Sequence, residues 1–220
     1  MQEEQYDKIG DTFAQNKAQF FETEKDFARE YILSKLHNTE GKTLIDIGCG
    51  AGEDVALYET MPFLAVYGID PSQVMVDKAK AIVRNPGRIS VGDYEHTGLP
   101  EGSVDFIVAR YSLHYLQNFD NAYAEMARIL KPGGVLIEMV DHPVADYVEG
   151  ERFQKNGSTY VRIKLYKGKV SIEFPLHNFS DYFSPTFFKH FELQEVVEHT
   201  GTDREFQAGP NALGYLAIKK

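Results

Sequence analysis

Three glycines alternate with other residues at the end of an apolar segment, a pattern that can hold a ligand close to the backbone. The segment LIDIGCGAGED covers residues 44–54 and contains Gly48, Gly50 and Gly52. Glycine lets a chain turn sharply from a strand into a helix, and its missing Cβ lets a ligand approach. The helix start that follows offers free N–H groups and a positive dipole end. Several classes of nucleotide-binding protein share such a turn, and a tight turn without a ligand is the alternative.

Acidic residues stand at the ends of the next two predicted strands. Asp70 ends the strand LAVYGID and lies 20 residues beyond Gly50, where a carboxylate can accept both hydroxyls of a ribose. Asp93 ends the third strand and could accept from an adenine amino group. Each acid alone is explained as well by a helix cap or a solvated loop. Their position at one edge of the same sheet as the glycine turn indicates a nucleoside-like ligand.

Alternating strands and helices are predicted to position these residues. Apolar segments predict strands at 43–47, 64–70, 88–93, 103–112 and 135–140. Helical spacing and start signals predict helices at 22–38, 53–59, 71–85 and 119–130. This order is typical of βαβ units with right-handed crossovers and a parallel sheet. The length suits a single α/β domain over residues 1–220.

The pattern changes after residue 140. Residues 158–175 alternate around Lys167 and Gly168, which predicts a β-hairpin. A short helix is expected at 184–191 and two late strands at 191–198 and 213–220. We expect residues 1–40 to form an N-terminal helical cap and residues 141–184 to form an insertion on the substrate side.

Composition limits the partners and the compartment. The net charge is −10 and the sequence pI is about 5.2, which disfavours a nucleic-acid partner because phosphate contacts need clustered Lys and Arg. Cys49 is the single cysteine, so an internal disulfide is excluded and a reducing compartment is permitted. The seven histidines show no metal-ligand spacing, and no metal is expected. Without a signal-peptide pattern or a membrane-spanning apolar run, we expect a cytoplasmic protein and no membrane partner.

Residues 43–140 resemble the class I S-adenosylmethionine-dependent methyltransferases, in particular their small-molecule, type 11-like branch. LIDIGCGAG resembles the first motif of the family, with Asp46 and the three glycines in register. VYGIDPSQVMVDKAK resembles the second motif, and VGDYEHTGLPEGSVDFIVARYSLHYL resembles the third and fourth together. The resemblance implies a doubly wound, Rossmann-like sheet of seven strands in the order 3-2-1-4-5-7-6, with strand 7 antiparallel.

The resemblance also implies which residues bind S-adenosyl-L-methionine. They are Tyr6, Asp46, Gly48, Cys49, Gly50, Asp70, Pro71, Met75, Asp93, Tyr94, Ala109 and Arg110. Asp70 would bind the ribose and Met75 would pack near the adenine, whereas Ala109 or Arg110 would lie beside the sulfonium. Tyr6 resembles an N-terminal tyrosine that covers the cofactor in many relatives, although it could equally be a surface aromatic.

Two points concern the reacting groups. His142 follows the strand 135–140 and could take a proton from a hydroxyl or amine, although a lone histidine is more often structural. His114 is expected to pack or bond locally, and Arg110 to hold an acidic substrate group or to pair with a carboxylate. Glu53 and Asp54 depart from expectation, because they place two acids near the cofactor's carboxylate.

The function implied is transfer of a methyl group from S-adenosylmethionine to O or N of a small molecule, by a monomer or homodimer. An NAD(P)-dependent oxidoreductase is one alternative, but its fingerprint is G-x-G-x-x-G and this chain has G-x-G-x-G. A sensor or partner subunit that binds the cofactor without catalysis is a second alternative, and the sequence leaves it open.

Overall fold

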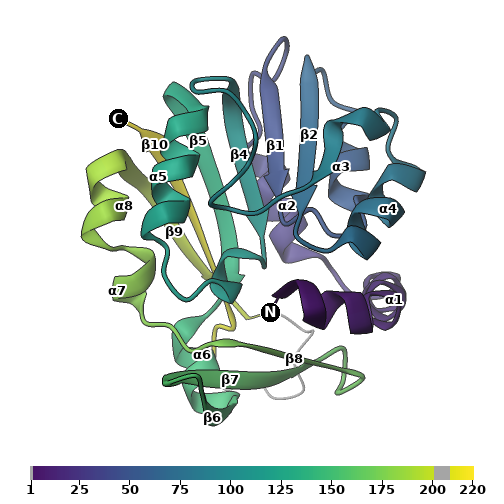
Figure 1. The fold of residues 1–220 in the computed structure, drawn as a ribbon, viewed down its shortest axis with the longest axis vertical. Helices are drawn as coiled ribbons and strands as arrows, with labels where there is room; N and C mark the ends of the chain where they lie inside the picture. Colours follow the sequence, from purple (N-terminus) through teal and green to yellow (C-terminus); the bar gives the residue numbers. More distant parts are fainter. Residues whose placement is uncertain (1, 201–208) are drawn as a thin grey trace.

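The computed structural model describes residues 2–200 and 209–220, which form a large sheet covered by helices and a smaller sheet at one end (Figure 1). The helices are α1 (Gln2–Phe21), α2 (Phe27–Lys35), α3 (Glu53–Tyr58), α4 (Gln73–Ile82), α5 (Asp120–Ile129), α6 (Pro143–Glu149), α7 (Phe179–Tyr182) and α8 (Pro185–His190), with 3-10 turns η1 (Pro86–Arg88) and η2 (Leu113–Tyr115). The strands are β1 (Thr43–Ile47), β2 (Ala65–Asp70), β3 (Ile89–Val91), β4 (Val104–Arg110), β5 (Leu130–Asp141), β6 (Glu151–Lys155), β7 (Ser158–Leu165), β8 (Val170–Pro175), β9 (Phe191–His199) and β10 (Ala212–Lys219).

The large sheet has the strand order β3-β2-β1-β4-β5-β10-β9. Strands β1 to β5 pair in parallel, whereas β10 runs antiparallel to both β5 and β9. Because β6, β7 and β8 belong to the other sheet, β9 and β10 are the sixth and seventh strands of this one. The predicted fold class, a seven-stranded doubly wound sheet with one antiparallel strand, is confirmed.

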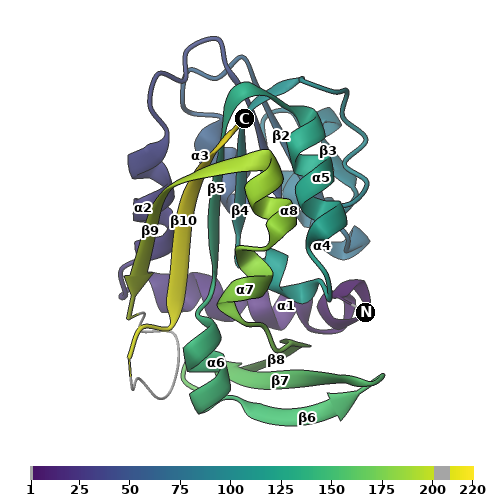
Figure 2. The same cartoon turned by 90° about the vertical axis from the view of Figure 1, so that its left-hand side faces the viewer.

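Helices cover both faces of this sheet, as the side view shows (Figure 2). Neighbouring residues of a strand point to opposite faces, so Leu44 of β1 packs in the core beneath α2, α3 and α4. Ile45 packs in the core beneath α5, α7 and α8. Burial on both faces explains why β1 and β4 are apolar almost throughout.

A cap formed by α1 together with β6, β7 and β8 lies at the carboxyl ends of the parallel strands. Phe20 of α1 packs in one cluster with Val161 and Leu165 of β7 and with Ile172 and Phe174 of β8. The views in Figures 1 and 2 place this small sheet beyond the end of the large one. The cap therefore joins the N-terminus of the chain to the segment between β5 and β9.

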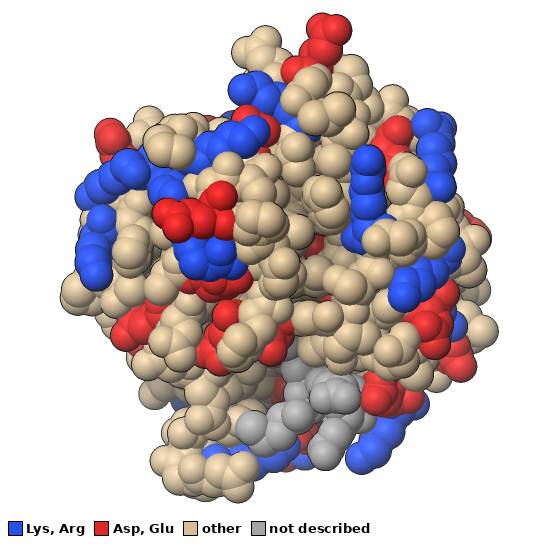
Figure 3. Space-filling view, turned by 45° about the horizontal axis from the view of Figure 1, so that its top comes forward, with Lys and Arg blue, Asp and Glu red and all other residues tan. Residues whose placement is uncertain are grey.

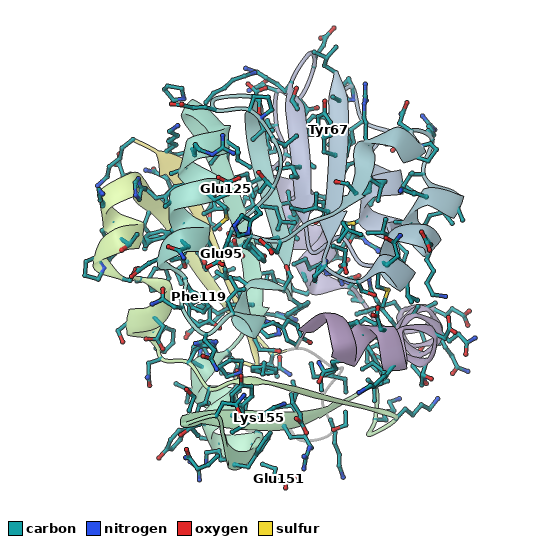
Figure 4. All side chains as sticks on the ribbon, in the orientation of Figure 1. Tyr67, Glu95, Phe119, Glu125, Glu151 and Lys155 are labelled. Carbon is teal, nitrogen blue, oxygen red and sulfur yellow. The ribbon has the colours of Figure 1, made fainter. Side chains whose placement is uncertain are left out.

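The small sheet differs from the predicted hairpin by one strand. β7 and β8 pair as expected around Lys167 and Gly168, but β6 pairs with β7 on the other side. Glu151 of β6 lies at the outer margin of the cap (Figure 4). The sequence of β6, ERFQK, has no run of alternating apolar residues, so periodicity gave no signal for this strand.

The N-terminal helices also differ in their limits from the prediction. The helix expected over 22–38 begins only at Phe27, because the Asp26 side chain caps α2 by accepting from the Arg29 N–H at 3.1 Å. The preceding α1 is a separate helix of 20 residues. A helical cap was expected over residues 1–40, but the bounds of this helix were not predicted.

Candidate functional site

A cavity lies between the carboxyl ends of the parallel strands and the cap. One side is the loop wall, which we define as residues 48–52 and 70–75 after β1 and β2. The other side comes from α1, β7 and β8, from the segment that follows β4 and from the last residue of β5. Eight of the predicted cofactor-binding residues line it, namely Tyr6, Asp46, Gly48, Cys49, Gly50, Asp70, Met75 and Arg110. The chain thus brings most of that set to one place.

The glycines of the loop wall have backbone conformations that other residues rarely adopt. Gly48 has φ +76° and Gly50 has φ +54°. A Cβ on Gly48 would lie 2.3 Å from the Cβ of Ser112, so glycine is required for the close approach of this turn to the segment after β4. A Cβ on Gly50 would meet no atom within 4 Å, so this backbone is open to a neighbouring molecule.

Asp70 is tied to both halves of the loop wall. Its carboxylate accepts from the Gly50 N–H at 2.9 Å and from the Ser72 N–H at 2.9 Å. Burial raises the pKa of this carboxyl to about 6 against the pull of these two hydrogen bonds. The residue therefore fixes the glycine turn against the end of β2 and still presents an acid to the cavity.

Acidic groups outnumber basic groups along the cavity. Burial, followed by the nearby Asp54, raises the pKa of Asp46 to about 8. The other acids in the lining are Glu53, Asp54, Asp70 and Asp141, and the basic residues are Lys17 and Arg110. Such a lining favours a ligand that carries positive charge.

The two acids after the last glycine are neutralised by ion pairs. Arg110 contacts Asp54 at 2.8 Å and Asp26 at 2.7 Å, and Arg29 contacts the other oxygen of Asp54 at 2.6 Å. Burial opposes ionisation of Asp54, but the two guanidinium groups and Lys17 lower its pKa to about 2. Of the two roles predicted for Arg110, pairing with a nearby carboxylate is the one observed.

Glu53 is paired as well, and its partner comes from the cap. Lys17 of α1 contacts Glu53 at 2.6 Å, with both side chains partly exposed. The repulsion expected between these acids and an anionic ligand group is therefore reduced at both positions.

Tyr6 is part of the cavity wall and not a surface aromatic. Its hydroxyl lies 2.6 Å from the hydroxyl of Tyr115 in η2, and its ring contacts that of Phe13 edge to face. Burial raises the pKa of Tyr6 above its ordinary value. Asp7 accepts from the Ser72 hydroxyl at 2.5 Å, which fastens α1 to the start of α4.

Four predicted cofactor residues lie outside the cavity lining. Asp93 accepts from the backbone N–H groups of Glu95 and His96, both at 2.8 Å, as a turn-capping residue does. Tyr94 is buried behind the wall, where its hydroxyl lies 2.7 Å from Ser112 Oγ. The remaining two are Ala109, buried in β4, and Pro71, between Asp70 and the cap of α4. Their contact with a cofactor stays a prediction.

His142 also lies outside the lining. It caps α6, where Nδ1 accepts from the Val144 N–H at 3.2 Å and Nε2 lies 2.8 Å from Glu198. These contacts are those of a structural residue, and the role as a base stays a prediction.

The cavity contains a pair that the sequence prediction did not select. His114 and Asp141 both line it, and His114 Nε2 lies 3.5 Å from Asp141 Oδ2. His114 does pack locally, against Tyr115 and Phe174, as expected. Asp141 carried a usable signal, since it ends a buried parallel strand in the same way as Asp70.

The surface and the helices add two observations. Lys and Arg side chains are interspersed with Asp and Glu on the face in Figure 3. Within residues 2–200 and 209–220, no helix is long and apolar enough to cross a membrane.

Comparison with known proteins defines the class. The sequence model of the family described as "Methyltransferase domain" matches residues 45–137. A solved structure, an S-adenosylmethionine-dependent methyltransferase from Mesorhizobium loti, superposes with a TM-score of 0.67 over 86% of this chain and 96% of that chain, at 19% identity. The fold is therefore that of the class I S-adenosylmethionine-dependent methyltransferases, and residues 45–137 match the methyltransferase family model, which confirms the resemblance seen in the sequence.

Two curated proteins are similar to this chain, and one of them is described as a methyltransferase. A protein of Haemophilus influenzae is 33% identical over 134 residues, which are 57% of this chain and 52% of that protein. A methyltransferase of Bacillus subtilis is 30% identical over 139 residues, which are 59% of this chain and 53% of that protein. The chain thus spans about half the length of these relatives.

Proposed function

We propose that this chain binds S-adenosylmethionine in the cavity and transfers its methyl group to O or N of a small molecule held beneath the cap. The observation that carries the proposal is the bond from the Gly50 N–H to Asp70, which unites the glycine turn and the strand-end acid in one wall. Open α/β sheets bind nucleotides at this edge. The matching family domain and fold support the same reading.

The residues present fit such a methyl donor. The backbone at Gly50 is open to a ligand, whereas a side chain there would project into the space. The excess of carboxyl groups suits a sulfonium and an ammonium. When bound, the donor supplies a methyl group whose transfer disperses the positive charge on sulfur. The protein's part is to align the acceptor and exclude water.

Each side of the cavity has a separate task in this proposal. Asp70 accepts from the ribose hydroxyls, and Met75 offers an apolar surface to the base. Tyr6 and Tyr115 close the side under α1. The acceptor occupies the remaining space, which lies over the ends of β4 and β5, beneath β7 and β8.

Calorimetric titration tests the proposal with S-adenosylmethionine, S-adenosylhomocysteine and NAD as separate ligands. We expect the first two to bind and NAD not to bind. Binding of NAD alone would contradict the proposal and favour an oxidoreductase. Release of S-adenosylhomocysteine from labelled S-adenosylmethionine, with a panel of small hydroxyl and amine compounds, separates an enzyme from a sensor subunit.

A further inference from the structure

The side of the cavity that the cap forms is aromatic. Four rings from α1, from η2 and from the turn after β7 line it, and we call them the aromatic wall: Tyr6, Phe13, Tyr115 and Tyr166. Tyr6 meets Phe13 and Tyr115 edge to face, and Phe13 meets Tyr166 in the same way, with centroids 5.2 to 5.7 Å apart. Because Tyr6, Phe13 and Tyr115 are partly exposed and line the cavity, a ligand there can reach their rings.

The aromatic wall carries no charge of its own. The hydroxyl groups of Tyr6 and Tyr115 lie 2.6 Å apart and bond to each other. Burial raises the pKa of both hydroxyl groups, so both stay protonated at neutral pH. Leu165 and Ile172 add apolar side chains to this part of the lining. The wall therefore presents ring surface to a ligand and not a charged group.

The basic side chains of the cavity are already paired with acids. Lys17 lies 2.6 Å from Glu53, and Arg110 lies 2.8 Å from Asp54. Within residues 2–200 and 209–220, these are the Lys and Arg side chains that line the cavity. The carboxyl group of Asp70, whose pKa is raised to about 6 by burial, adds a negative charge at neutral pH. An anionic acceptor would therefore meet no Lys or Arg outside an ion pair, whereas a cation would be attracted.

Methyl transfer to an uncharged amine keeps a positive charge in this cavity. The lone pair of the nitrogen forms the new N–CH₃ bond. The bond between the methyl carbon and sulfur breaks, and its electron pair goes to sulfur. The positive charge of the sulfonium is thereby replaced by one on nitrogen. The reacting amine has released its proton to water before it binds, so the transfer itself requires no base.

We infer that the acceptor is a tertiary amine and that the aromatic wall holds its quaternary ammonium product, an inference that rests on the proposed function. The faces of aromatic rings attract cations, most strongly where water is excluded. A quaternary ammonium has no N–H group to donate, so ring faces are the contacts that suit it. The same attraction acts on the charge that develops on nitrogen during transfer, and it therefore stabilises the transition state more than the uncharged amine.

The test compares three probes of similar shape on the full chain loaded with S-adenosylhomocysteine. Choline is a cation, 3,3-dimethylbutan-1-ol is its uncharged carbon isostere, and 3,3-dimethylbutanoate is an anion. Calorimetry measures the Kd of each probe. We expect choline to bind at least about ten-fold more tightly than the alcohol, and the carboxylate to bind more weakly than both. The ratio of the Kd values of the alcohol and choline is the readout, because a general loss of packing would weaken both.

Matched variants show whether the rings cause this preference. Phe13→Leu keeps an apolar side chain but removes a ring, and it should lower the ratio by at least about two-fold. Tyr115→Leu should also lower it, whereas Tyr115→Phe keeps the ring and should keep the ratio. Phe188→Leu removes an exposed ring of α8 outside the cavity lining and should match the wild type. If Tyr115→Leu does not fold, as judged by circular dichroism, Phe13→Leu carries the test.

The outcomes that would overturn the inference are distinct from failure of the proposed function. Equal or tighter binding of the alcohol, tighter binding of the carboxylate, or binding of none of the probes overturns it. A ratio that is unchanged in both leucine variants overturns the role of the aromatic wall. Release of S-adenosylhomocysteine with hydroxyl compounds but with no tertiary amine also overturns the inference. Absence of S-adenosylhomocysteine binding in the separate titration would instead overturn the proposed function, and the inference with it.

Discussion

The loop wall and the cap enclose the same cavity, but different contacts hold them. The loop wall depends on backbone conformation and on hydrogen bonds between backbone and side chain, such as those of Asp70. The cap depends on side chains from distant parts of the chain, as in the contact of Tyr6 with Tyr115, 109 residues apart. Substitutions in the loop wall should therefore have large effects on folding and ligand binding. Substitutions in the cap should change the affinity for the ligand by smaller amounts.

The largest effect is expected at Gly48. Alanine there must adopt φ +76° and would place its Cβ 2.3 Å from Ser112 Cβ. A left-handed non-glycine residue costs about 1–2 kcal/mol, and forced overpacking costs about 1–3 kcal/mol more. Gly48→Ala should lower the free energy of unfolding by about 2–5 kcal/mol in urea denaturation.

Gly98→Ala is the matched control for this prediction. Gly98 has φ +72°, but a Cβ there would meet no atom within 4 Å. Its cost should be limited to the backbone, about 1–2 kcal/mol. Equal losses in the two variants would show that the close approach to Ser112 has no energetic weight.

A smaller effect is expected at Asp70, on binding. Loss of charged hydrogen bonds to the ribose should weaken binding of S-adenosylhomocysteine by about 1.5–3 kcal/mol in Asp70→Asn. This corresponds to an increase of about ten- to 150-fold in Kd. Calorimetry with both proteins measures it, and an unchanged Kd would leave Asp70 as only a support of the loop wall.

The pH dependence of the same binding gives a second test of Asp70. Burial raises the pKa of this carboxyl to about 6, so the group is ionised above that pH and protonated below it. Because the ionised form accepts from the ribose hydroxyls, wild-type affinity should fall as the pH decreases below about 6. Asp70→Asn should show no such decrease, and a flat wild-type profile between pH 5 and 8 would contradict the assignment.

The contrast between the two regions also explains what the sequence could reveal. Gly48, Gly50 and Asp70 follow apolar strands at fixed spacing, and local rules place all of them at one sheet edge. The strand β6 has a polar composition without apolar alternation, and only the Asn156-Gly157 turn before β7 is a local signal for its hairpin. The contacts of Phe20 with β7 and β8 join distant parts of the chain, and long-range contacts of this kind leave no local pattern.

The positions of two histidines could not be predicted from the sequence either. His142 and His114 both follow strands of the sheet, so strand position alone could not separate them. The positive φ of Tyr111, +52°, precedes the η2 turn that contains the cavity-lining His114. A proline after His142 starts α6, and the histidine side chain is used to cap it. Turn geometry decides which ring reaches the cavity, and the sequence alone does not specify it.

In the cap, Tyr6→Phe should have a moderate effect. It removes the bond to the Tyr115 hydroxyl, and a hydrogen bond contributes about 0.5–1.5 kcal/mol net. Kd for S-adenosylhomocysteine should rise about two- to ten-fold. Tyr160→Phe is the control. It removes the hydrogen bond that the hydroxyl of Tyr160, in β7 of the cap, accepts from Gln117, and neither residue lines the cavity. An equal rise in both variants would mean that Tyr6 acts only through cap stability.

Hydrogen exchange shows whether the cap responds to the ligand as a unit. With S-adenosylhomocysteine bound, protection should increase in α1 and in β7 and β8, because these elements share one apolar cluster. Protection confined to the loop wall would show that the cap does not close over the ligand.

The smallest effects are expected at the ion pair that joins the cap to the loop wall. Lys17 and Glu53 lie 2.6 Å apart with side chains 22% and 32% exposed, and pairs of this kind contribute up to about 1 kcal/mol. Both residues line the cavity, where the carboxylate of the methyl donor would be attracted by Lys17 and repelled by Glu53. Glu53→Gln should therefore tighten binding of S-adenosylhomocysteine, and Lys17→Met should weaken it, each by up to about five-fold. Calorimetry at low and high salt measures both changes in Kd, which should become smaller as salt screens the charges. If both variants shift Kd in the same direction, loss of the contact between Lys17 and Glu53 affects binding more than the charge of either side chain does. That result would also show that Glu53 does not repel the ligand.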